Sequence, residues 1–420
     1  MLKRRVLFSL CVLSLAVSSR AEITPEPGTL FEFAKKAWVV GVVSLGHPQS
    51  FDNGGILAFP AQIDELVWSR GATPQTLTLM YDVPREEKNT PYFKEHDVFL
   101  APFRQLPDYS SWREKLPGKR RYQVYGGRRY VFRGDDIPQV KRILADFLAA
   151  SDAKASDHEV AEVRVVITAL GSGNAVVRED AARFLTSYPN LARDFADSDV
   201  APLAAYLGGD APFEEKMPLV DALAAAKVTA IKPSLAELGK RDDASGAVGL
   251  RGLAGFGEWP QTGRLLELSR SSSKEMRCYA AEALGRRAAT DPQAMQRVKD
   301  LFVQQEDPRI IDSVGVGLAH SGGENVIVFL GEALARGDAT SISAGKSLAA
   351  IGGPAATAVL KKTLEEKQGP AATAAANGLR SMEGCPDCGV ILETQYKQHP
   401  DPEVRSLIGI ILGVRLQHKH

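Results

Sequence analysis

A unit of about 31 residues recurs through the C-terminal two-thirds of this 420-residue chain, and it constrains the fold more than any other feature. Each copy has a short polar loop, an acidic or proline-bearing helix start, a basic residue and then small apolar residues. The clearest copy runs from Lys274 to Gly285. We predict that the second helix of each unit starts near residues 175, 213, 244, 274, 307, 339, 370 and 401.

This spacing accommodates two helices of three or four turns and two short loops. A helix pair of that size buries only one of its sides and must stack on a neighbour, so the repetition predicts an α-solenoid of about eight helix pairs. Proline is tolerated in the first turn because its missing N–H would be unpaired there anyway. Small residues such as Ala281 and Gly285 allow neighbouring helices to approach closely.

The repeats carry two recognisable patterns, Asp-Pro-x-x-Arg at Asp401–Arg405 and Ala-Ala-x-Ala-Leu-Gly at Ala280–Gly285. Together they resemble the short HEAT repeats of bacteria, the kind also found in phycobilin lyases, over roughly residues 155–417. The resemblance implies a scaffold or binding surface more often than an enzyme. A lyase would need a cytoplasmic, pigment-bearing substrate, and the signal-peptide pattern described next argues against that location. Basic residues recur at what we take as one repeat position, where each is expected to tie its helix to a loop: Arg178, Arg277, Arg309 and Arg405.

Residues 1–21 have the pattern of a secretory signal peptide. A basic start at Lys3–Arg5 precedes an apolar stretch, Val6–Val17, and Ser19 and Ala21 supply small residues before a cut at Glu22. The alternative is a short membrane anchor that is never cut. No run of 18 apolar residues predicts a transmembrane helix. We therefore expect an exported protein, periplasmic or extracellular, with no transmembrane segment in the mature chain.

Residues 29–134 change from helical to alternating periodicity. Gly126-Gly127 can supply the positive φ values of a tight turn, so the flanking segments are predicted to form a β-hairpin. Five or six strands in about 100 residues predict a small barrel or sandwich. The layout resembles small secreted barrel modules of OB-like shape in bacterial envelope proteins. The strands are predicted at residues 37–45, 57–68, 77–83, 97–103, 121–125 and 128–132.

These features divide the chain into four parts: a signal peptide (1–21), a small β-barrel-like domain (22–136), a docking helix with a linker (137–155) and a HEAT-like solenoid (156–420). The helix is predicted at 137–149, with one apolar side that docks the barrel onto the solenoid. The predicted fold class is therefore α+β multidomain, with an N-terminal OB-like barrel followed by an α-α superhelical solenoid.

A basic, aromatic-rich segment surrounds the predicted hairpin. With aromatic neighbours, such a segment suits an anionic partner: a glycan, a lipid headgroup or an acidic protein face. Nucleic acid is the least favoured partner because an exported protein meets little of it. The competing interpretation is a solvated face paired to nearby acids. The candidate residues of an anionic-partner surface are Arg120, Arg121, Arg128, Arg129 and Arg133.

Cys385 and Cys388 form the one constellation with chemical potential. Three interpretations are open: a local disulfide that stiffens the turn, a redox-active pair with Cys385 at a helix N-cap, or half of a metal site. His399 would then supply a third metal ligand, and His418 or His420 a fourth. A disulfide is favoured, because an oxidising compartment closes such pairs and thioredoxin-like enzymes place the motif after a strand.

Charge and motifs limit the function. The chain has 51 basic and 51 acidic residues, too balanced for a dedicated nucleic-acid binder. Nucleophile elbows, phosphate-binding glycine loops and H-E-x-x-H metal motifs are missing from the sequence. We therefore predict a non-enzymatic envelope scaffold without a cofactor, whose solenoid holds a protein partner on its concave face while the basic hairpin contacts an anionic surface. The alternative is a thiol-redox or metal-handling protein that uses Cys385 and Cys388.

Overall fold

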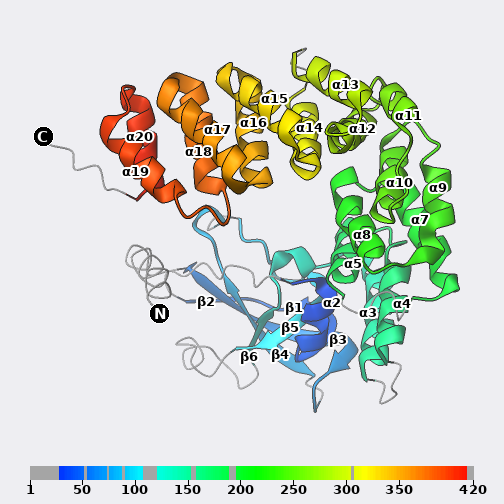
Figure 1. Cartoon of the computed structure of the whole chain (residues 1–420). Coiled ribbons are helices and arrows are strands. Elements are labelled where there is room, and N and C mark those ends of the chain that lie inside the picture. Colours follow the sequence, from blue (N-terminus) through cyan, green and yellow to red (C-terminus); the bar gives the residue numbers. More distant parts are fainter. Residues whose placement is uncertain are drawn as a thin grey trace, which may run out of the picture. The chain divides into compact units, whose positions relative to one another are not determined.

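The computed structural model shows an α+β protein, with a closed five-stranded barrel followed by many helices (Figure 1). It divides into two compact units, Met1–Tyr206 and Leu207–His420. The first helix pair after the barrel thus belongs to the barrel's unit, although the solenoid was predicted to begin at residue 156. The predicted signal peptide lies outside the described residues. The structure describes residues 28–51, 54–72, 75–87, 90–106, 121–152, 158–188, 195–303 and 307–413.

The barrel closes because its first strand pairs on both sides. β1 is antiparallel to β5 and to β3, and the sheet continues from β5 through β6 and β4 back to β3. The β4–β6 pairing is parallel, while β2 adds to β3 outside the closed ring. The strands are β1 (Val39–Leu45), β2 (Gln49–Phe51), β3 (Ile56–Ser69), β4 (Thr76–Asp82), β5 (Val98–Gln105) and β6 (Arg121–Val124).

Alternate side chains of the strands fill the barrel interior, as period-2 patterning requires. Phe59, Leu79, Phe99 and Phe103 are fully buried there. Ile56, Ala58 and Met80 point to the other face of β3 and β4, where they form a second buried cluster with Leu106. That outer face is therefore packed.

The predicted hairpin is wrong. Gly126 and Gly127 do have positive φ values, 78° and 82°. After them the chain forms a short 3-10 helix, η3 (Arg128–Tyr130), and β6 pairs with β4 and β5 instead. The reason is packing: the ring of Tyr130 turns inward against Phe33, with ring centroids 5.3 Å apart. A strand at 128–132 would lose this contact, and only Phe132 bridges to Leu100.

The helices α2 (Leu30–Lys36), α3 (Asp136–Asp152), α4 (His158–Ala169) and α5 (Ala175–Ser187) belong to the barrel's unit, whose boundary falls within the next described helix. The predicted helix at 137–149 is α3, and it packs on β3 and β5 as well as on α4. Phe31 of α2, Phe147 of α3 and Phe184 of α5 form a ring triad, with centroids 5.1 to 5.9 Å apart. The first helix pair is thus fastened to the barrel by aromatic packing.

Buried charge reinforces that junction. Asp180 of α5 is fully buried and accepts hydrogen bonds from the Leu30 N–H at 2.5 Å and from Arg129 at 3.2 Å. Because Leu30 is the first residue of α2, Asp180 satisfies one of the orphan donors at that helix start. Glu162 of α4, only 3% exposed, pairs with Lys35 at 2.6 Å.

The remaining helices follow the predicted repeat. Seven of the eight predicted second-helix starts match an observed first helical residue or the residue before it, starting with Ala175 and Phe213. The eighth, Pro370, is the second residue of its helix. Asp401 is the N-cap of the last helix. The helices are α7 (Val200–Gly208), α8 (Phe213–Ala225), α9 (Lys232–Leu238), α10 (Ala244–Gly255), α11 (Thr262–Leu268), α12 (Lys274–Arg287), α13 (Pro292–Val303), α14 (Pro308–Ser321), α15 (Glu324–Ala335), α16 (Ala339–Ile351), α17 (Gly353–Glu366), α18 (Gly369–Ser381), α19 (Cys388–Gln398) and α20 (Pro402–Ile411). The predicted positions of the second helices are confirmed.

Within the second unit, Leu207–His420, the helices stack in two layers (Figure 1). Each even-numbered second helix from α8 to α20 contacts the next even-numbered helix, and α15, α17 and α19 contact one another in the other layer. This arrangement is compatible with a helical-repeat solenoid. None of the described helices combines the length and the apolar character needed to span a bilayer.

The even-numbered layer packs through very small residues. A methyl group added to Gly317 of α14 would lie 2.1 Å from the carbonyl oxygen of Glu282 of α12. On the next interface, buried Ser343 and Ser347 of α16 donate to the carbonyls of Ile311 and Gly315 at 3.3 and 3.0 Å. The helix backbones are therefore in direct contact, as the sequence's small residues predicted.

Candidate functional site

The second helices leave one side of their layer uncovered. The other sides pack on neighbouring second helices and on the first helices, so the remaining side of each helix faces solvent in a narrow stripe. We call these stripes together the second-helix face. It is made of Asp221, Arg251, Cys278, Glu282, Arg286, Asp312, Val316, His320, Ile342, Lys346, Ala350, Thr373, Asn377, Arg380 and Ile410, all exposed or half-buried.

An ion ladder crosses the α8–α12 part of this face. Arg251 of α10 pairs with Asp221 of α8 at 3.2 Å and with Glu282 of α12 at 2.8 Å. Glu282 also pairs with Arg286 at 2.9 Å, and Arg286 reaches Nε2 of His320 on α14 at 3.3 Å. The charges of this part therefore compensate one another across four helices.

The α14–α18 part has a different chemistry. Val316 is 47% exposed and Ile342 is 59% exposed, on neighbouring helices. Lys346 and Arg380 form no ion pair with any other described residue. Asp312 is the one acidic residue in the sequences of α14, α16 and α18. Apolar surface and uncompensated positive charge thus lie together here.

The recurring arginines belong to the loops. Nη1 of Arg178 donates to the carbonyls of Ser172 and Gly173 at 2.7 and 2.9 Å. Nη1 of Arg277 donates in the same way to Ser271 and Ser272, at 2.8 and 2.9 Å.

Arg405 likewise donates to His399 and Pro400, so three of the four arginines have the loop-tying role that we expected. Arg309 does not share their position, because it lies two residues after its N-cap, Asp307, and the other three lie four after theirs. Ile311 occupies the equivalent position in that repeat and is buried.

The basic segment is largely neutralised from within. Arg129 pairs with Glu179 at 2.6 Å and with Asp180, and Arg128 pairs with Glu87. Arg133 pairs with Asp97 at 3.2 Å. These three arginines hold the barrel's loops and its first helix pair and form no open basic patch.

Two arginines of the basic segment also contact aromatic rings. Arg128 and Arg133 lie on the ring of Tyr92, at 5.1 and 4.4 Å from its centroid. Two tyrosines of the segment itself, Tyr125 and Tyr130, pack on Phe33, so they are used inside the barrel's unit. Arg121 has an interaction within the molecule and belongs to β6, and Arg120 lies outside the described residues.

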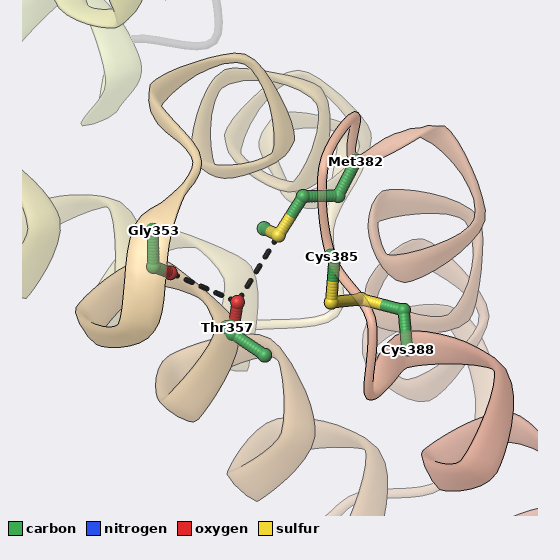
Figure 2. Close-up of a disulfide and its surroundings, with 5 residues drawn as sticks. All are labelled: Gly353, Thr357, Met382, Cys385 and Cys388. Carbon is green, nitrogen blue, oxygen red and sulfur yellow. Dashed lines mark hydrogen bonds between the residues drawn. A yellow bond between two sulfur atoms is a disulfide. The ribbon is translucent and has the colours of Figure 1, made fainter.

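Cys385 and Cys388 are joined by a disulfide, with their sulfur atoms 2.06 Å apart (Figure 2). The bond closes the turn between α18 and α19. Contrary to the expectation that Cys385 is the N-cap, α19 begins at Cys388 and its N-cap is Asp387. The reason is that Pro386 stays in the turn. Figure 2 also shows Met382 and Thr357 beside the bridge, with the Thr357 hydroxyl 3.1 Å from the Met382 sulfur.

His399 is not directed at this pair. It is 1% exposed; its Nδ1 accepts from the Asp401 N–H and its Nε2 lies 3.1 Å from the Lys367 carbonyl. Nδ1 therefore serves the loop between α19 and α20, and Nε2 ties that loop to the C-cap of α17. Among the described residues no group of three or more His, Cys, Asp or Glu side chains has a metal-binding arrangement. His418 and His420 lie outside the described residues.

A shallow groove of about 830 Å³ opens in the other layer, between α13 and α15. It lies opposite the place where glycines bring α12 and α14 into backbone contact. Two of the polar residues that line it are engaged within the protein: Asp291 accepts from Thr262, and Asn325 reaches the carbonyl oxygens of Ala288 and Ala289. Shallow and open, the groove differs from the concave pockets that typically bind small molecules.

No family model matches the chain, and no curated protein matches it. One solved structure, the crystal structure of an engineered protein, is 21% identical over 64% of this chain and 84% of its own. Its TM-score is 0.31, too low to support an argument about fold or function.

The sequence analysis missed the residues that distinguish the two parts of the second-helix face. Val316, Ile342, Lys346 and Arg380 did not stand out because single exposed aliphatic or basic residues are ordinary in a helix. Aligning the repeats on their N-caps would not have found them either, because Val316 lies nine residues after Asp307 and Ile342 only four after Asp338.

Proposed function

We propose that the protein is an exported scaffold of the bacterial envelope that binds a polypeptide partner on the second-helix face. The observation that carries the proposal is the part of this face on α14–α18, where Val316 and Ile342 are exposed on two helices that pack closely on each other. Such a surface is rigid and needs little ordering before it binds. Export rests on the signal-peptide pattern of residues 1–21.

The proposal includes a curved, HEAT-like solenoid. Glycine, alanine and serine make the even-numbered layer narrow, whereas large side chains such as Phe302 and Phe329 separate the first helices. A row of wedge-shaped pairs curves toward its narrow side, so the second helices form the concave surface. Concave surfaces of stacked repeats suit extended or folded polypeptides.

The barrel supports a structural role in this proposal. Its strand order, with a parallel pairing between β4 and β6, favours an OB-like barrel. OB-folds use the outer face of their second and third strands for ligands. The corresponding face here contains Ile56, Ala58 and Met80, all buried. We therefore assign partner binding to the helices and leave the anionic partner of the basic segment out of the proposal.

We propose a non-enzymatic role, because the second-helix face offers apolar and cationic contacts and no nucleophile–base pair. The thiol-redox or metal-handling alternative retains only Cys385 and Cys388 themselves, because His399 is engaged elsewhere.

Cross-linked recovery from the envelope fraction tests the proposal. We compare the double variant Val316→Asp/Ile342→Asp with a matched control, Val303→Asp/Val328→Asp, which makes the same change at exposed aliphatic residues of the other layer. We expect wild type and control to recover the same stoichiometric partner and the face variant to lose it, with similar melting temperatures for both variants. Equal recovery by both variants would refute the proposal.

A further inference from the structure

We propose that the α14–α18 part of the second-helix face selects an acidic, apolar polypeptide segment, with an apolar side chain seated on Val316 and Ile342 and carboxylates at Lys346 and Arg380. This inference rests on the proposed function and names the chemistry of the partner.

The charge distribution is the first argument. On α8–α12 the exposed charges neutralise one another, since Arg251 bridges Asp221 and Glu282. The ladder ends at His320 of α14, and the exposed stripe of that helix also contains Val316 and one acid, Asp312. Lys346 on α16 and Arg380 on α18 follow without an ion-pair partner among the described residues, and neither α16 nor α18 contains an acidic residue. Free cations at this surface favour carboxylates of a partner.

The apolar contacts give the second argument. Ile342 lies one helical turn before Lys346 on α16, so an apolar side chain that covers Ile342 brings its neighbouring residues to the ammonium group. Val316 extends the apolar area onto α14. Two exposed aliphatic residues on neighbouring helices, on one face with two cations that have no ion-pair partner among the described residues, match a segment in which apolar and acidic residues alternate.

Asn377 explains why a polypeptide fits better than another anionic amphiphile. Its side-chain N–H donates to the Thr373 carbonyl at 3.1 Å, and its side-chain oxygen accepts no hydrogen bond from described residues. That oxygen is exposed and can accept a backbone N–H. Helices in backbone contact lie about 8 Å apart, and an extended chain advances roughly 3.3 Å per residue, so side chains two to three residues apart meet successive helices.

Fluorescence anisotropy with two synthetic peptides of equal length tests the inference on the purified full chain. In the first peptide every third residue is either leucine or glutamate, in alternation. In the second peptide lysine replaces each glutamate. We expect wild type to bind the leucine–glutamate peptide at least about tenfold more tightly than the leucine–lysine peptide. Lys346→Glu and Arg380→Glu should each abolish or reverse that preference.

Lys362→Glu is the matched control, because Lys362 is exposed on α17 and the variant changes the net charge equally. It should keep the wild-type preference. Equal binding of both peptides, no binding of either, or the same loss in Lys362→Glu would overturn the inference. So would binding of phosphatidylglycerol vesicles in place of the peptide, lost in Lys346→Glu. A cellular partner that needs Val316 and Ile342 but tolerates Lys346→Glu would leave the proposed function standing and refute this inference alone.

Discussion

The first helix pair and the later pairs have the same repeat pattern, but different interactions hold them against their neighbours. At the barrel, α5 is joined to α2 and α3 by a buried carboxylate, Asp180, and by a triad of phenylalanine rings. From α12 to α18 the second helices are joined by close contacts of glycine and serine with the neighbouring backbone. The comparison shows that the helical pattern of the sequence determines where each helix pair forms. The residues at the interface between pairs determine which element that pair packs against.

The largest effect is expected at the charged junction. Asp180→Ala removes the acceptor of the Leu30 N–H and the buried partner of Arg129, so we expect a loss of about 4 kcal/mol in the free energy of unfolding. Glu179→Ala, which removes the half-exposed partner of the same arginine, should lose about 0.5 kcal/mol. Urea unfolding of both variants measures the difference. Similar losses would show that the buried carboxylate has no special role.

The glycine contacts should be the next most sensitive. Gly317→Ala forces a methyl group against the Glu282 carbonyl, and we expect a loss of about 3 kcal/mol. Gly263 lies in α11 with open space around it, so Gly263→Ala should gain about 0.5–1 kcal/mol from helix propensity. Thermal and urea unfolding check both. A neutral Gly317→Ala would contradict close packing between α12 and α14.

The disulfide should contribute less, because it closes a short loop. Cys385→Ser/Cys388→Ser is expected to lose about 2 kcal/mol, from greater freedom of the unfolded chain. Hydrogen exchange should place the loss in α19 and α20. Partner recovery from the envelope should not change. Loss of recovery with an unchanged melting curve would instead favour the thiol-redox alternative.

The smallest expected effect is a pH dependence at the last repeat. The Gly369 N–H bonded to the Asp401 carboxylate lowers the pKa of that group below its ordinary value. The native state therefore binds the proton less readily than the unfolded chain. The stabilisation is complete above about pH 4 and is lost as pH falls further. Asp401→Asn should make stability less dependent on pH below that value, and an unchanged acid limb would contradict this assignment.

The sequence predicted the repeat well because its signals are local. N-caps such as Asp243, Ser273 and Asp401, together with helical periodicity, determine where second helices begin. Five of the predicted strands also match, since alternating apolar residues record which side faces the barrel interior. The helix starts and these five strands, which depend on local signals, therefore correspond closely to the structure.

Long-range contacts are what the sequence could not supply. The Gly126-Gly127 turn has the expected φ values, yet Tyr130 packs on Phe33, which lies almost 100 residues earlier, and no second strand forms. The basic segment looked open because Glu87, Asp97 and Glu179, which neutralise it, lie elsewhere in the chain. Lys346 and Arg380 became notable only once the structure showed that neither has an ion-pair partner among the described residues.

Site-specific photo-crosslinking in cells tests the central claim most directly. A photoreactive residue is placed, one site at a time, at three exposed aliphatic residues of the second-helix layer (Val316, Ile342, Ile410) and at three of the other layer (Val303, Val328, Val390), which have comparable exposure. The account predicts crosslinks to one protein from Val316 and Ile342, and none to that protein from the three sites of the other layer. Crosslinks to the same protein from both layers, or only from the other layer, would contradict it.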